Sequence, residues 1–428
     1  MPRSRQDNLV AGLDIGSAFV RMAVGQVFTR EETHEAEQLH ILGLAEVSSQ
    51  GVHRGIINSI EDVVSAVSEC LEQTERMVGV PLDSVWVGVS GLHIMVQKSH
   101  GVVAVSKPEG EIGEEDVARA VEASRSIATP LNYEVLHVLP KSFSIDGQSG
   151  IKDPVGMTGI RLEVDTQIIL GSAAQIKNLT KAIYRAGLEI DDLVLSIIAA
   201  AEAVITPRQK ELGVVVVNLG ASTTSLVAYE EGEILHTAII PLGSEHITND
   251  IAIGLRTSID IAEAVKIAHG NCAPDAVFKR DQLDLYEVGA PEHELIKKEY
   301  LHDIIQARAE EILRKINAEL TALQRSGLLP AGVVFTGAGA KLGGLIDLSK
   351  KILRLPSTLG YPLGLGSVTD KINDLGFSSA VGLVKWGSMM GETIGRKNGV
   401  RRSGLSSVRK VGGALSQQLK KMMKSLIP

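Results

Sequence analysis

The sequence has few aromatic residues, two cysteines and no long apolar run, and each shortage excludes a class of protein. Aromatic residues make up 3% of the 428 residues, which leaves little surface for stacking on bases and argues against nucleic-acid binding. Cys70 and Cys272 provide neither a disulfide framework nor zinc-ligand spacing, so we expect a reducing, cytoplasmic environment. The longest apolar run, residues 193–205, is shorter than the roughly 20 residues that span a bilayer and predicts a buried helix. We expect no signal peptide, because residues 1–8 are polar.

Acidic residues are absent from the last part of the chain. Residues 393–428 contain nine Lys or Arg and no acid, which leaves a net charge of −17 on the rest of the chain. An acidic body also argues against a nucleic-acid-binding face. Residues 387–407 are rich in glycine, serine and basic side chains, which predicts a flexible linker.

The segment 408–428 regains a helical period. Val408 and five later apolar residues follow at spacings of 3, 4, 4, 3 and 4, which puts them on one helical face. The apolar residues are Val411, Leu415, Leu419, Met422 and Leu426, and the basic residues Lys420, Lys421 and Lys424 fall largely on the other side. A basic amphipathic helix of this kind binds in the plane of an anionic membrane surface. A helix packed on the body and a calmodulin-type target helix are the alternatives, and the long linker argues against simple packing.

Two strand–turn–strand patterns about two hundred residues apart look alike. Residues 12–17 (GLDIGS) and residues 217–224 (VNLGASTT) each place Asp or Asn at the end of an apolar strand, before a turn of small residues. Gly16 and Ser17 form the first turn, and Gly220, Ser222, Thr223 and Thr224 form the second. Glycine and hydroxyl residues let backbone N–H groups approach a phosphate closely. Two such turns facing each other would hold the phosphates of a nucleotide from both sides.

A third glycine-rich turn follows the buried strand 333–336. It contains Gly337, Ala338, Gly339 and Lys341, and a flat base can lie against its bare backbone. Any one of these turns is common in surface hairpins. The three in this order resemble the two phosphate loops and the adenosine loop of the actin-like ATPase superfamily. The fold class that this implies is α/β: a two-lobed actin-like ATPase fold with an inserted α+β subdomain and a C-terminal amphipathic helix.

Strand and helix patterns divide the chain further. We expect a helix capped by Ser59, a long helix over residues 293–325, and a small α+β module inserted in the first lobe. The predicted segments are 8–84 (first lobe), 85–161 (SHS2-like insert), 162–205 (first lobe again), 206–375 (second lobe), 376–392 (a helix returning to the first lobe), 393–407 (linker) and 408–428 (amphipathic helix).

Four further stretches give the resemblance its specificity: residues 99–106, 151–157, 185–195 and 248–257. With them the chain resembles the FtsA family of actin-like bacterial division proteins from about residue 8 to its end. The resemblance implies a protein that binds ATP and Mg²⁺, forms filaments and binds the C-terminal peptide of the tubulin-like FtsZ. It also implies recruitment of other division proteins through residues 85–161, and a peripheral position on the cytoplasmic face of the bacterial cell membrane at the division site. A pilus-assembly adaptor of the same fold is the alternative, although such proteins usually lack the membrane tail.

The resemblance also assigns site residues. Nucleotide contacts fall to Asp14, Gly16, Ser17, Arg21, Asn218, Gly220, Ser222, Thr223, Thr224, Gly243, Glu263, Lys266, Gly337, Ala338, Gly339 and Lys341. Asp14 would reach Mg²⁺ through water, and Glu263 and Lys266 would contact the ribose and the base. The alternative for the last two is a solvated helical ion pair, worth only ~0.3–0.5 kcal/mol. Arg308, in a stretch that matches the family's segment near the peptide site, would pair with an acidic FtsZ peptide.

The departures from the family pattern concern hydrolysis. Asn218 stands where the family usually has Asp, and Phe19 stands where it usually has Lys. A neutral amide cannot supply the carboxylate that orders magnesium or positions an attacking water. Arg21 lies on the same face of the strand as Phe19 and can replace the missing cation. We therefore expect ATP binding with at most weak ATPase activity, so the protein is not expected to act as an enzyme.

Overall fold

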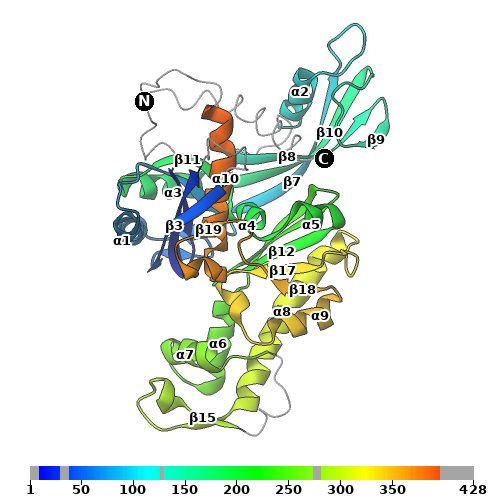
Figure 1. The fold of residues 1–428 in the computed structure, drawn as a ribbon. Helices are drawn as coiled ribbons and strands as arrows, with labels where there is room; N and C mark the ends of the chain where they lie inside the picture. The colour runs from blue at the N-terminus through cyan, green and yellow to red at the C-terminus, as the bar shows by residue number, and fades with distance from the viewer. Residues whose placement is uncertain (1–8, 29–37, 126–129, 273–280, 396–428) are drawn as a thin grey trace.

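The computed structural model describes residues 9–28, 38–125, 130–272 and 281–395 (Figure 1). The predicted amphipathic helix 408–428, with its apolar and basic faces, lies outside the described residues. Most of the predicted linker 393–407 does so as well. No helix of the described segments is long and apolar enough to span a bilayer.

The first lobe is built on a six-stranded sheet in the order β11-β6-β1-β2-β3-β19. Its strands are β1 (Leu9–Ile15), β2 (Phe19–Phe28), β3 (Gln38–Ser48), β6 (Ser84–Val89), β11 (Glu189–Leu195) and β19 (Gly366–Ser367). Strands β1 to β3 form an antiparallel meander, and β6 and β11 continue the sheet in parallel with β1. Helices α1 (Ile60–Val78) and α3 (Ala173–Arg185) pack on one face. Ser59 caps α1 as predicted, because its side chain accepts a hydrogen bond from the Asp62 N–H.

The second lobe repeats this order. Its sheet runs β14-β13-β12-β17-β18, with β12 to β14 antiparallel and β17 and β18 parallel to β12. The strands are β12 (Val214–Leu219), β13 (Thr224–Glu230), β14 (Glu233–Ile240), β17 (Val333–Thr336) and β18 (Ser357–Leu359). Both faces of this sheet are covered, so the valines of residues 214–217 pack into two different cores. Val214 and Val216 pack in the core that contains α4 (Ser196–Val204), whereas Val215 and Val217 pack in the core that contains α8 and α9. The twin lobes confirm the two-lobed α/β class.

The far end of the second lobe consists of helices and a short ribbon (Figure 1). It contains α6 (Ser244–Leu255), α7 (Ile259–His269), β15 (Gln282–Asp284), η3 (Leu285–Val288), β16 (Leu295–Lys297) and α8 (Lys298–Ala322). The long helix predicted over 293–325 is therefore shorter at its start. Residues 295–297 pair with β15 as a strand, and a strand pairing of this kind cannot be read from the helical period.

The inserted module projects from the first lobe as a four-stranded sheet, β7-β10-β8-β9, with α2 on one face (Figure 1). Its elements are β7 (Ile94–Ala104), α2 (Glu114–Arg125), β8 (Tyr133–Ile145), β9 (Gln148–Ile151) and β10 (Arg161–Ser172). The predicted bounds 85–161 are displaced at both ends. Strand β6 pairs with β1 in the first-lobe sheet, and β10 lies in the insert between β7 and β8.

The insert also touches the second lobe. The Gln167 Nε2 group donates to the Leu235 carbonyl at 3.2 Å, and Lys152 Nζ donates to the Glu231 carbonyl at 2.9 Å. Strand β10 and the end of β9 are thus tied to the edge of the other lobe's sheet.

Two helices pass between the two large sheets: α4 (Ser196–Val204) and α10 (Ser378–Gly395). They cross so closely that a Cβ atom on Gly382 would lie 2.0 Å from the Ala199 carbonyl oxygen. Strand β1 approaches α10 in the same way, since a Cβ atom on Gly12 would lie 2.5 Å from the Ala380 oxygen.

These helices correct two predictions. Residues 193–195 end strand β11, so the buried helix predicted for 193–205 begins at Ser196. The linker predicted from residue 387 is helical to Gly395, because Gly387 continues α10 and packs against Trp86. The remaining short elements are β4 (Val52–His53), β5 (Ile56–Ile57), α5 (Pro207–Leu212), η4 (Ala338–Lys341), α9 (Leu345–Leu353), η5 (Asp370–Asn373) and η6 (Leu375–Phe377).

We expect Gly382→Ala to destabilise the protein by about 1–3 kcal/mol, the usual cost of overpacking. Helix propensity alone would favour alanine by about 1 kcal/mol, but the added methyl group meets a backbone oxygen that cannot move without shifting α4. The measurement is the urea midpoint followed by circular dichroism. Gly113→Ala is the control, because a Cβ atom there lies 3.7 Å or more from its neighbours. Equal midpoints for the two variants would show that the crossing tolerates a side chain.

Candidate functional site

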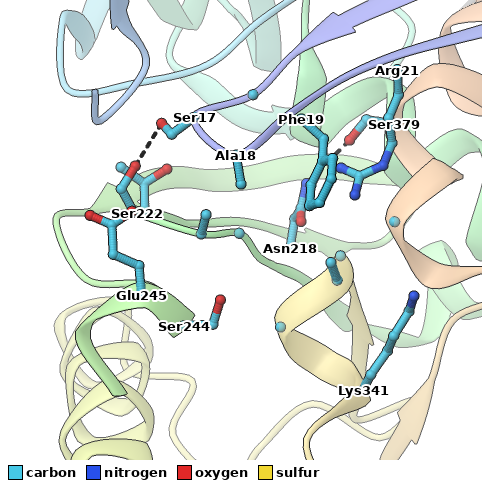
Figure 2. A pocket seen from close by; sticks show the side chains of 18 of the residues that line it. Ser17, Ala18, Phe19, Arg21, Asn218, Ser222, Ser244, Glu245, Lys341 and Ser379 are labelled. Atoms are coloured by element: carbon cyan, nitrogen blue, oxygen red, sulfur yellow. Dashed lines mark hydrogen bonds between the residues drawn. The ribbon is translucent and has the colours of Figure 1, made fainter. Parts of the chain in front are cut away.

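A cavity of about 570 Å³ lies between the two lobes (Figure 2). Its walls come from the β1–β2 and β12–β13 turns, the beginning of α6, helix α7 and the turn after β17. The duplicated order of the two sheets puts the ends of β1 and β12 opposite each other. The three small-residue turns of the sequence therefore meet in one place.

The first two turns have the same backbone geometry. The Gly16 N–H donates to the Phe19 carbonyl, and the Gly220 N–H donates to the Thr223 carbonyl, each at 3.0 Å. The Ser222 hydroxyl then donates to the Ser17 hydroxyl at 2.6 Å and joins the turns of the two lobes (Figure 2). The turns face each other at the separation of one hydrogen bond.

A third segment supports this contact from the first lobe. In the turn between β4 and β5, the Arg54 N–H donates to the Ser222 hydroxyl at 3.1 Å and the Gly55 N–H donates to the Ser17 hydroxyl at 3.3 Å. Both residues have positive φ, which points successive N–H groups in one direction. The sequence analysis missed this turn, because no motif connects it to the other two.

The turn after β17 brings bare backbone close to β12. Gly337 has φ +86°, and a Cβ atom there would lie 2.1 Å from Asn218 Oδ1. At Gly339 a Cβ atom would lie 2.7 Å from the Leu219 side chain. No larger residue fits either position, so one wall of the cavity is backbone of the kind that a flat base can contact.

Most of the predicted nucleotide residues line the cavity: Asp14, Gly16, Ser17, Arg21, Asn218, Gly220, Ser222, Thr223, Glu263, Lys266, Gly337, Ala338, Gly339 and Lys341. Thr224 and Gly243 do not. Thr224 is buried and donates to the Leu242 carbonyl at 2.7 Å, and Gly243 packs against the Ala221 carbonyl, so both support the second turn from behind.

Each basic side chain that lines the cavity is paired with a carboxylate. The pairs are Arg21 with Glu46 at 2.5 Å, Lys266 with Glu263 at 2.6 Å, and Lys341 with Asp374 at 2.7 Å. The Lys266 side chain is 11% exposed and also donates to the Thr248 hydroxyl, whereas the Glu263 side chain of the same pair is 44% exposed. Arg21 faces the cavity beside Phe19, with its guanidinium 5.0 Å from the ring centroid.

The polar residues that end β1 and β12 have matching partners. Asp14 accepts a hydrogen bond from the Ser196 hydroxyl at 3.0 Å, and Asn218 donates to the Ser379 hydroxyl at 3.2 Å. Ser196 begins α4 and Ser379 lies in the first turn of α10, so the two lobes repeat even this contact. Burial raises the pKa of Asp14, whereas the Ser196 hydrogen bond and the nearby Arg21 charge act in the opposite direction. Neither serine belongs to a motif, and the sequence analysis missed both.

Comparison with known proteins identifies the family. The family model of the SHS2 domain inserted in FtsA matches residues 91–170, and the model of the cell division protein FtsA matches residues 215–382. The chain is 33% identical to the cell division protein FtsA of Pseudomonas aeruginosa over 387 residues, which cover 90% of this chain and 91% of that protein. It is 34% identical to FtsA of Bacillus subtilis over 395 residues, 92% of this chain and 87% of that protein. The chain belongs to the FtsA family of cell division proteins.

Solved structures agree with the fold at low sequence identity. The PilM–PilN type IV pilus biogenesis complex matches with a TM-score of 0.65 and 18% identity, over 90% of this chain and 99% of that chain. MreB5 of Spiroplasma citri bound to ADP matches with a TM-score of 0.54 and 13% identity, over 91% and 98%. These likenesses confirm the actin-like fold alone. The FtsA-type insert, matched at 91–170, agrees with the module seen in the structure rather than with 85–161.

We expect the unmodified protein to hydrolyse ATP very slowly and Asn218→Asp to raise the rate. A positioned acid–base group typically increases the reaction rate by about 10²–10⁴-fold. The Ser379 hydroxyl, which now accepts a hydrogen bond from Asn218, can rotate to donate one to the new carboxylate. The measurement is steady-state phosphate release. Asn249→Asp adds the same charge at an exposed position of α6 and should change nothing. Brisk hydrolysis by the unmodified protein would contradict this expectation.

Proposed function

We propose that this division protein binds ATP with Mg²⁺ between its lobes, polymerises, and tethers FtsZ filaments to the cytoplasmic face of the membrane at the division site. The observation that carries the proposal is the pair of matching turns joined by Ser17 and Ser222 in a chain of the FtsA family. The other division proteins would bind the inserted module, whose elements run from Ile94 to Ser172.

The cavity fits a nucleotide. Its volume is within the usual 300–1,000 Å³ of small-molecule sites, and glycine backbone lines both the phosphate turns and the opposite wall. The described residues include no group of three or more His, Cys, Asp or Glu side chains that would hold a metal alone. This fits Mg²⁺, which usually keeps several waters and is held by one or two carboxylates together with phosphate oxygens. Asp14 is the carboxylate that the family resemblance assigns to it.

The peptide site is proposed on α6 and α8, at the end of the second lobe. Apolar side chains are exposed on adjoining elements there: Ile253 is 77% exposed, Leu295 66% and Tyr300 49%. The Tyr300 hydroxyl donates to the Gly254 carbonyl at 3.4 Å, which places Tyr300 close to Ile253. An extended peptide with alternating apolar and acidic residues suits such a surface.

Arg308 is already engaged by acidic neighbours. It donates to both carboxylate oxygens of Asp250, at 2.6 and 3.0 Å, and to Glu311 at 2.5 Å. These contacts raise the pKa of Arg308, with the Asp250 hydrogen bond as the main cause. We propose that an acidic peptide residue exchanges with one of these carboxylates, so that Arg308 keeps a partner in both states.

We expect Arg308→Glu to weaken binding of a labelled FtsZ C-terminal peptide by about tenfold or more, since a charge-assisted hydrogen bond contributes ~1.5–3 kcal/mol. Fluorescence anisotropy measures the affinity. Arg314→Glu is the matched control, because Arg314 lies on the same helix, is 69% exposed and pairs with Glu310. Equal affinities for the two variants would remove Arg308 from the peptide site.

The membrane part of the proposal rests on residues 408–428. One tail is expected to bind reversibly, because burial of its apolar face is offset by ordering of the helix. Polymerisation of the body aligns many tails and raises their avidity. Attachment would therefore accompany assembly.

We expect a chain ending at Ser407, and full-length Leu419→Glu, to lose cosedimentation with anionic liposomes. Leu419 is on the apolar face, whereas Gln417→Glu places the same charge on the polar face and should keep most binding. ATP and an FtsZ peptide are added in separate arms to test the coupling to assembly. If the shortened chain pellets with vesicles as the parent does, the tail is not the anchor.

A further inference from the structure

One carboxylate in the cavity has no partner among the residues that the structure describes. Four line the cavity, namely Asp14, Glu46, Glu245 and Glu263. Glu46 and Glu263 form ion pairs, and Asp14 accepts the Ser196 hydrogen bond. The Glu245 carboxylate lines the cavity but makes no hydrogen bond or ion pair with the described part of the chain.

The backbone of Glu245 is held firmly. Helix α6 begins at Ser244, whose N–H donates to the Gly220 carbonyl at 2.9 Å, and the Glu245 N–H donates to the Ala221 carbonyl at 2.8 Å. The first turn of α6 is thereby fixed to the second phosphate turn. In Figure 2 the Glu245 side chain extends from this helix end toward Ser222, the residue that contacts Ser17 of the other lobe.

The charge balance of the cavity indicates what this carboxylate meets. Arg21, Lys266 and Lys341 each form an ion pair with another carboxylate, so none of them pairs with Glu245, whereas Asp14 has the Ser196 hydrogen bond and the nearby charge of Arg21. A nucleotide brings several further negative charges to the same turns. Carboxylates from both lobes that line the same cavity would repel the phosphates, and a divalent cation relieves such repulsion.

We propose that Glu245 is the second-lobe carboxylate for the magnesium ion of the bound nucleotide, and so supplies the charge that Asn218 lacks. Asp14 would hold the ion from the end of β1, and Glu245 would hold it from the first turn of α6. This inference rests on the proposed nucleotide site and adds a residue to it. Asn218 keeps its contact with Ser379 and has no part in holding the metal.

The test is the Mg²⁺ dependence of binding of a fluorescent, non-hydrolysable ATP analogue, measured by anisotropy at a fixed protein concentration. Glu245→Gln is expected to raise the Mg²⁺ concentration for half-maximal binding by about tenfold, with binding in EDTA unchanged or tighter. Asn218→Asp in the Glu245→Gln background is expected to lower that concentration again, because it restores a carboxylate in the second lobe. Glu109→Gln, at an exposed position of the insert, is the control and should match the parent.

Four results would overturn the inference. An unchanged Mg²⁺ requirement in Glu245→Gln, with the same thermal unfolding midpoint as the parent, shows that the residue does not serve the metal. If Glu245→Gln binds the analogue more tightly by the same factor with and without Mg²⁺, Glu245 only repels the phosphates and does not hold the metal. If the parent protein binds the nucleotide equally well with and without Mg²⁺, the inference about Glu245 is wrong but the proposed nucleotide site is supported. If the parent protein binds no nucleotide, both the inference and the proposed nucleotide site are wrong.

Discussion

The close crossing of α4 and α10 is the contact on which the rest of the structure depends. These helices lie between the two sheets, and Gly382 against Ala199 leaves no room for a side chain. Ser196 at the start of α4 and Ser379 in the first turn of α10 bind Asp14 and Asn218. The packing that joins the lobes therefore also sets the distance between the β1–β2 turn and the β12–β13 turn. A side chain at the crossing would disturb the site without touching it.

The duplicated site is symmetric in geometry and asymmetric in charge. Each lobe contributes a turn with the same backbone hydrogen bond and a polar residue held by a helix-terminal serine. The first-lobe residue, Asp14, is a carboxylate, and burial raises its pKa. The second-lobe residue, Asn218, is a neutral amide. The second lobe therefore offers a neutral hydrogen-bonding group at the position where the first lobe offers a carboxylate.

The inserted module is placed where it contacts both lobes. It grows out of the first lobe, and Gln167 and Lys152 tie it to strand β14 and the adjoining turn of the second. If one lobe rotates against the other, these contacts must either break or move together with the second lobe. These contacts link the module directly to the second lobe, and the surface of α6 and α8 that we propose for peptide binding lies at the opposite end of the molecule (Figure 1).

The sequence by itself determined the local features: the three small-residue turns, the Ser59 cap and the family resemblance. Their signals lie within a few neighbouring residues, which is why they could be predicted. Tertiary structure decided the rest, because strand pairing and close packing join distant residues. It put β6 in the first lobe and β10 in the insert, made 295–297 a strand, and let α10 run through Gly387 against Trp86. It also brought Ser196, Ser379 and Glu245 to the cavity. These residues lie in the first turns of helices, and only the fold decides which helix ends lie at the cavity.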